Sequence, residues 1–79
     1  MDGGTISTPV YTKHARKRMI ERSISESDVE AVLEKPHMTY GDGKGNRNFV
    51  RTVKGRRIRV VVKGDPPGDP PIIITAMDQ

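Results

Sequence analysis

The residues best suited to chemistry lie near the start of the chain and are spaced four positions apart. They are one histidine and two arginines, His14, Arg18 and Arg22. On an α-helix this spacing holds the three side chains within about 80° of arc, beside one another. An imidazole can act as a general acid or base near neutral pH, and a guanidinium can donate two hydrogen bonds to a phosphate. The same pattern also fits structural contacts with a neighbouring helix.

A second feature is the separation of charge along the chain. Residues 44–63 contain eight basic side chains and no acidic one, whereas residues 23–34 contain four acidic side chains and no basic one. The net charge is +4. Such a separation attracts phosphates to one region. We therefore predict a nucleic-acid-binding surface, with RNA as the ligand, made by Arg22, Lys44, Arg47, Arg57 and Lys63. The alternative is a solvated strand surface whose charges protect a sheet edge.

Composition argues against several other classes of function. The chain has no cysteine, and His14 and His37 stand apart from any carboxylate pattern, so we expect no metal site. The glycine-rich residues 41–45 lack the Walker spacing, so we expect no cofactor. The apolar run 72–74 is far shorter than the roughly 20 residues of a membrane span, and no apolar leader begins the chain. We expect a cytoplasmic protein without membrane contact; nothing in the sequence fixes the oligomeric state.

Two helices should carry the first of these features. Thr12 can cap a helix over residues 13–22. Ser25, with Asp28 three positions later, forms a capping-box pattern that begins a second helix. Pro36 should end that helix by forcing the preceding residue out of the helical region.

Val10 and Tyr11 can add a short edge strand before the first helix, and several strands should follow the second helix, at residues 37–40, 46–53, 56–63 and 72–77. Lys54 and Gly55 suit a two-residue hairpin turn, which pairs Arg51 with Ile58. Arg51 would then share the core face with Ile58, because directly paired residues project to the same side. Since an unpaired buried guanidinium is not tolerated, Arg51 must lie at the margin of the sheet, or the register must differ.

These elements predict one small α+β domain. We expect a disordered tail at residues 1–8 and a domain over 9–79 with a proline-rich loop at 64–71. The expected fold is a two-helix hairpin packed on one face of a three- to four-stranded antiparallel sheet. The unbroken apolar run 72–74 further predicts a last strand that is covered on both faces.

The chain also resembles a known family. The run His14-Ala15-x-x-Arg18-Met19-x-Glu21-Arg22, with Gly-Arg-x-Ile-Arg-Val at 55–60 and Ile-Thr at 74–75, is similar to a family of small bacterial domains of unknown function. That family is grouped with RelE-like toxins and, more loosely, with barnase, EndoU and colicin-type ribonucleases. The resemblance covers about residues 10–77. Ser23 departs from it, because glycine is common there in the family.

The resemblance implies a metal-independent ribonuclease toxin. His14, Arg18 and Arg22 match the signature, and Arg59 and Thr75 follow less closely. Such an enzyme needs a base, an acid and cations around one phosphate. The resulting hypothesis gives the proton transfer to His14 and charge stabilisation to Arg18, Arg51 and Arg59.

The partners implied are RNA and an acidic antitoxin or immunity protein. The alternative function is a non-catalytic module of the same fold that binds nucleic acid or an acidic protein. Tyr40 and Phe49 can stack on bases in either case, although core packing is the commoner role of such residues.

Overall fold

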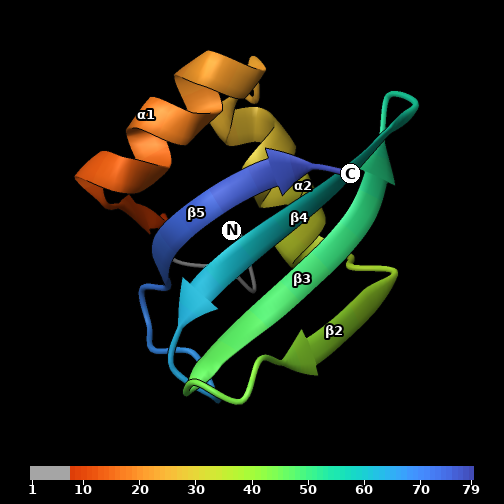
Figure 1. Ribbon diagram of the computed structural model, residues 1–79. Coiled ribbons are helices and arrows are strands. Elements are labelled where there is room, and N and C mark those ends of the chain that lie inside the picture. Colours follow the sequence, from red (N-terminus) through yellow and green to blue (C-terminus); the bar gives the residue numbers. More distant parts are fainter. Residues whose placement is uncertain (1–7) are drawn as a thin grey trace, which may run out of the picture.

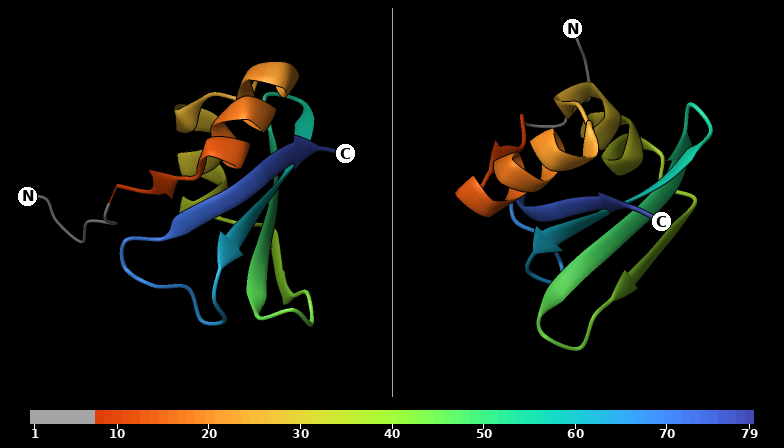
Figure 2. Two further views of the ribbon diagram at one scale, coloured as in Figure 1. Left: turned by 60° about the vertical axis from the view of Figure 1, so that its left-hand side comes forward. Right: turned by 45° about the horizontal axis from the view of Figure 1, so that its top comes forward.

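The computed structural model describes residues 8–79 and shows a sheet with both helices on one face (Figures 1 and 2). The elements in chain order are β1 (Val10–Tyr11), α1 (Lys13–Arg22), α2 (Glu26–Glu34), β2 (Met38–Gly41), β3 (Asn46–Val53), β4 (Arg56–Lys63) and β5 (Ile72–Asp78). The strands lie in the order β1-β5-β4-β3-β2. β1 pairs with β5 in parallel, and the other pairs are antiparallel.

The predicted sheet of three to four antiparallel strands is wrong, because the sheet has five strands and is mixed. The additional strand, β1, is only two residues long and pairs Val10 with Ile72 and Tyr11 with Ile73. The sequence indicated a short edge strand here, but two residues are too few to show which strand they pair with or in which direction. Their pairing depends on a segment far along the chain.

The helices also differ from the predicted hairpin. α1 packs on β5 and β1, α2 packs on β3 and β4, and few contacts join the two helices. Each helix therefore buries its apolar side against the sheet rather than against the other helix. Their connection explains the divergence, because it begins with a residue in the left-handed region, Ser23 at φ 54°.

The end of α1 is a Schellman motif. The backbone N–H of Ser23 donates to the carbonyl of Ile20 (3.3 Å), and that of Ile24 donates to the carbonyl of Met19 (2.8 Å). These bonds satisfy carbonyls that the end of a helix leaves free. Met19 and Ile24 are both buried, which supplies the hydrophobic contact that accompanies this motif.

The helix starts agree with the sequence. The Thr12 hydroxyl accepts from the N–H of Ala15 (3.0 Å), as an N-cap does. Ser25 and Asp28 form the predicted capping box, with both reciprocal bonds at 3.1 Å. Two local patterns therefore set where both helices begin.

The β3–β4 hairpin has the predicted register. Phe49 lies opposite Val60, and Arg51 lies opposite Ile58. The turn residues Lys54 and Gly55 both have positive φ, at 53° and 81°, as a primed turn requires. Arg51 thus lies on the same face as the fully buried Ile58, which leaves its guanidinium to be accounted for.

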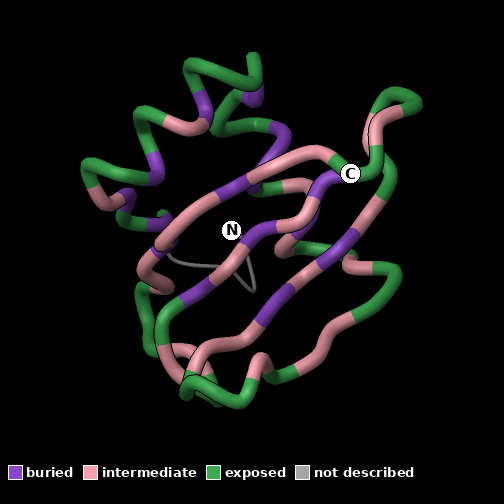
Figure 3. The backbone as a smooth tube through the Cα atoms, in the orientation of Figure 1, coloured by how far each residue is buried: buried purple, intermediate pink, exposed green. Residues whose placement is uncertain are grey.

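The core lies between the helices and the sheet, and buried positions recur along both helices and along β3, β4 and β5 (Figure 3). Its fully buried members come from both layers and are Ala15, Val29, Val32, Ile58, Val60, Val62, Ile73 and Ala76. In the apolar run of β5, Ile73 is buried, but Ile72 and Ile74 are only partly so. The prediction of a last strand covered on both faces is wrong, because among the described elements the helices cover one face only.

The remaining segments connect or flank this core. Residues 64–71 join β4 to β5, and the carboxylate of Asp65 lies 3.6 Å from the guanidinium of Arg47 on β3. Of the tail predicted at residues 1–8, positions 1–7 lie outside the described residues. Within the part of the chain that the structure describes, neither helix is long and apolar enough to cross a membrane.

Candidate nucleic-acid interface

The sheet face away from the helices is the strongest candidate for a binding surface. Alternation along each strand and the pairing registers place a defined set of side chains there. This set, called the open face below, consists of Met38, Tyr40, Asn46, Asn48, Val50, Thr52, Arg57, Arg59, Val61, Lys63, Thr75 and Met77. It holds three cationic side chains, all from β4, and none of its members is acidic.

Arg59 occupies the middle of the open face. One terminal nitrogen of its guanidinium, Nη1, donates to the hydroxyl of Tyr40 (3.3 Å), and Nη2 lies 2.9 Å from the sulfur of Met77. Its Nε is buried and has no hydrogen-bond partner. Arg59 therefore joins β2 to β5 with neutral, weak acceptors, which leaves its positive charge uncompensated by these contacts.

The Tyr40–Arg59 hydrogen bond covers the strand between them. Tyr40 is on β2 and Arg59 is on β4, and neighbouring strands lie roughly 4.8 Å apart, so the two side chains must meet above β3. The residues of β3 on this face, Asn48 and Val50, are each only 2% exposed, although no helix covers them. The Tyr40–Arg59 bridge accounts for that burial.

Asn48 carries a polar group that this arrangement leaves unpaired. Its side-chain nitrogen, Nδ2, is buried and has no hydrogen-bond partner within the described chain. An unpaired buried amide costs about 1–3 kcal/mol, and native proteins contain few such groups. The side-chain amide of Asn48 is thus an unpaired donor beneath the Tyr40–Arg59 hydrogen bond, and its burial lowers the stability of the domain.

The structure separates the residues assigned to catalysis. His14 is exposed on α1, Arg51 lies on the helix-facing side of β3, and Arg59 lies on the open face. Arg18 on α1 is 3.7 Å from Glu21 and is paired with it. The imidazole and the two sheet arginines therefore do not converge on one position that a phosphate can occupy.

Arg51 instead serves the packing of α2. Its Nη1 donates to the carbonyl of Ala31 (3.0 Å), which also accepts from the backbone N–H of Lys35 where the helix ends. The carbonyl end of a helix carries partial negative charge, so a guanidinium is favoured there. This contact partly satisfies the charged side chain beside the core and is compatible with the predicted register, although the Nε of Arg51 is buried without a partner among the described residues.

Three of the residues assigned to nucleic-acid binding remain accessible. Arg57 and Lys63 are exposed on the open face, and Lys44 is exposed in the β2–β3 loop. The Nε of Arg57 donates to the side-chain oxygen of Gln79 (3.3 Å), a neutral acceptor. The charges of Arg57 and Lys63 therefore flank Arg59 along β4.

The other two are engaged by carboxylates elsewhere. Arg22 is 3.4 Å from Asp78, at the end of α1. Arg47 donates to the hydroxyl of Thr39 (2.7 Å) and lies 3.6 Å from Asp65 on the proline-rich loop. Both project on the helix side of the sheet or beyond its edge, so they do not extend the open face.

The two aromatic candidates also separate. Phe49 packs against the core, whereas Tyr40 belongs to the open face.

Asn48 was not recognised from the sequence. The predicted hairpin register places it on the face opposite to Phe49, so a polar residue in the middle of a strand was the available signal.

Three comparisons with known proteins complete this description. A family model described as "Domain of unknown function (DUF4258)" matches residues 11–78. A search of the curated proteins and a search of the solved structures each gave no match.

Among residues 8–79, no three histidine or carboxylate side chains come together as a group that can hold a metal ion.

Proposed function

This chain belongs to the DUF4258 family, and we propose that its open face binds single-stranded RNA. The observation that carries the proposal is the group of Arg57, Arg59 and Lys63 on one face without a carboxylate. Cations concentrated in this way bind phosphates and release their counterions.

The shape of the surface favours a single strand. A sheet face that carries an aromatic ring and a guanidinium offers planar groups on which unstacked bases can stack. Tyr40 and Arg59 provide one group of each kind, and they contact each other. The choice of RNA rests on the resemblance of the His14-to-Arg22 segment to a family of small bacterial domains that is grouped with RelE-like toxins.

Binding without cleavage is the function that the geometry favours. Metal-independent cleavage needs a base, an acid and cations around one phosphate. The open face provides the cations but contains neither histidine nor carboxylate. His14 lies on a helix that packs against the other side of the sheet.

Salt-dependent binding of a labelled single-stranded RNA tests the proposal. The slope of log affinity against log salt is about −0.7 for each phosphate contact, so replacing Arg57 and Lys63 by glutamine should reduce its magnitude by ~1.4. The matched control replaces Lys13 and Lys35, which are exposed outside the open face, and should leave the slope nearly unchanged. Equal effects of the two pairs, or no binding at low salt, would overturn the proposal.

The same samples distinguish the competing functions. Gel analysis should show intact RNA after incubation with the wild-type protein. Cleavage that disappears in His14→Ala would favour the ribonuclease hypothesis instead. Binding of an acidic peptide through Arg57 and Lys63, without affinity for RNA, would favour the protein-binding alternative.

A further inference from the structure

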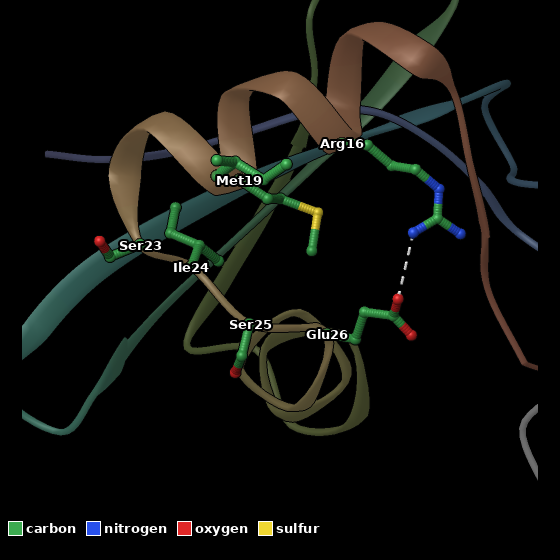
Figure 4. Close-up of a pocket in the computed structure, with 7 residues that line it drawn as sticks. Arg16, Met19, Ser23, Ile24, Ser25 and Glu26 are labelled. Atoms are coloured by element: carbon green, nitrogen blue, oxygen red, sulfur yellow. Dashed lines mark hydrogen bonds and ion pairs between the residues drawn. The ribbon is translucent and has the colours of Figure 1, made fainter.

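A pocket of about 430 Å³ lies between the second half of α1 and the start of α2. Met19 and Ile24 give it an apolar lining, and Ser25 lies beside them (Figure 4). The ion pair between Arg16 and Glu26, at 3.2 Å, spans from one helix to the other at its side. The pocket arises because the helices diverge from the Schellman turn rather than pack on each other.

An exposed apolar side chain stands directly beside this pocket. Ile20 lines it and is 80% exposed, the highest exposure among the large apolar residues that the structure describes. Ile20 projects from α1 on the side away from the sheet, since the buried residues of that helix are Ala15 and Met19. An exposed apolar side chain, the knob, and an apolar pocket, the hole, therefore lie next to each other on one surface.

The charges around the pocket also come in two complementary halves. On α1, Lys13, Arg16 and Lys17 are exposed, and the one acidic residue of the helix, Glu21, is paired with Arg18. On α2, the exposed residues Glu26 and Glu30 are acidic, and the helix contains no basic residue. The pocket lies on the boundary between the basic helix and the acidic helix.

The carboxylates of α2 also lie close enough to Tyr11 to affect its pKa. The pKa of Tyr11, beneath the two helices, is raised to about 12, first by burial and then by the nearby carboxylates of Glu26 and Glu30. Arg16, whose guanidinium lies 5.2 Å from the centre of the Tyr11 ring, only partly offsets this effect. Glu26 is paired with Arg16, whereas within residues 8–79 Glu30 makes no ion pair, so the charge of Glu30 is available to an outside cation.

We propose that the pocket receives Ile20 of a second copy of this chain. A two-fold axis near the pocket would insert each Ile20 into the pocket of the other copy. It would also lay the basic α1 of one copy against the acidic α2 of the other, with Lys17 facing Glu30 twice. A two-fold interface requires one self-complementary patch, and this patch supplies the knob, the hole and both charges.

A different protein with an apolar anchor would also fit the pocket, but it would have to bring its own arrangement of charges. A second copy of this chain already carries the apolar side chain, the pocket and the charges of both signs that the interface requires. The surface lies on the opposite side of the sheet from the open face, so the dimer would leave the proposed RNA-binding surface uncovered on both copies.

Analytical ultracentrifugation from about 1 µM to about 1 mM protein tests the proposal, since these concentrations span weak to moderate affinities. The wild-type protein should dimerise within this range. Ile20→Glu should raise the dimer Kd at least ~10-fold, because it loses an apolar contact and buries a charge. Met38→Glu is the matched control, as it makes an exposed apolar residue acidic on the open face, and should leave the dimer Kd unchanged.

A charge-reversal pair makes the test specific to the two-fold arrangement. Lys17→Glu alone and Glu30→Lys alone should each be monomeric, because like charges then face each other twice. Mixing the two variants should restore a dimer, now of one copy of each. A monomer at every wild-type concentration, or a mixture that stays monomeric while the wild-type protein dimerises, would overturn the proposal.

Discussion

Replacement of Asn48 by leucine should stabilise the domain. The asparagine side chain is almost wholly buried, its Nδ2 has no partner, and its neighbour on the same face, Val50, is apolar. Leucine has the same number of side-chain heavy atoms and no polar group to satisfy. The substitution therefore removes a cost without opening a cavity.

The size of the effect follows from the unpaired amide. A buried donor without a partner costs about 1–3 kcal/mol, so the free energy of unfolding should rise by ~1–2 kcal/mol after imperfect packing is allowed for. In a domain of this size each kcal/mol raises Tm by roughly 4–8 °C. Urea and thermal unfolding followed by circular dichroism at neutral pH measure both quantities.

Thr52→Val provides the matched control. Thr52 is on the same strand and the same face but is exposed, so this substitution should change the free energy of unfolding by no more than about 0.5 kcal/mol. It isolates the general gain from placing an apolar residue on β3. A gain in Asn48→Leu that does not exceed this control would show that the buried amide carries no cost.

The binding assay extends the same prediction. If the unpaired amide is retained to donate to RNA when the Tyr40–Arg59 bridge opens, Asn48→Leu should be more stable and bind RNA more weakly. A variant that is less stable than wild type would refute the reasoning, because it would mean that Asn48 is satisfied where it lies. A more stable variant with unchanged affinity would remove Asn48 from the interface.

Two further predictions concern the ends of the helices and of the sheet. Ser23→Gly should increase the free energy of unfolding by ~1 kcal/mol, because glycine adopts the left-handed conformation of Ser23 without strain, whereas Ser23→Val should decrease it; urea unfolding measures both. The pKa of Asp78 is lowered in the folded protein, first by the hydrogen bond from Arg56. A lowered folded-state pKa contributes stability that is fully present above the ordinary pKa and is lost as the pH falls through the folded-state value. Unfolding midpoints should therefore fall less in Asp78→Asn than in wild type when the pH is lowered from about 6 to about 3.

The parts of the fold that depend on neighbouring residues were predictable. Thr12 and Ser25 mark helix starts through bonds that span three residues, and Lys54-Gly55 closes a hairpin whose alternation fixes its register. The sequence indicated an edge strand at Val10 and Tyr11, but its parallel partner was not predictable, because Val10 pairs with Ile72, 62 positions away. Nothing local shows which strand so short a segment pairs with.

The candidate site divides in the same way. The register that pairs Arg51 with Ile58 already places Arg59 on the opposite face, so the separation of these two arginines follows from the sequence. The contact between Arg59 and Tyr40 does not, since it also depends on how β2 aligns with β3 across a glycine-rich loop. The separation of His14 from both arginines was not predictable, because it depends on how α1 packs on β5.

The position of β5 has a consequence for synthesis on the ribosome. The apolar side of α1, with Ala15 and Met19, packs on β5, and the N–H of Thr12 donates to the carbonyl of Ile73 (3.1 Å). A nascent chain emerges from its N-terminal end, so α1 has no surface to dock on until residues 72–78 have left the exit tunnel. Until then the β3–β4 hairpin can form locally, while α1 is exposed to chaperones and proteases.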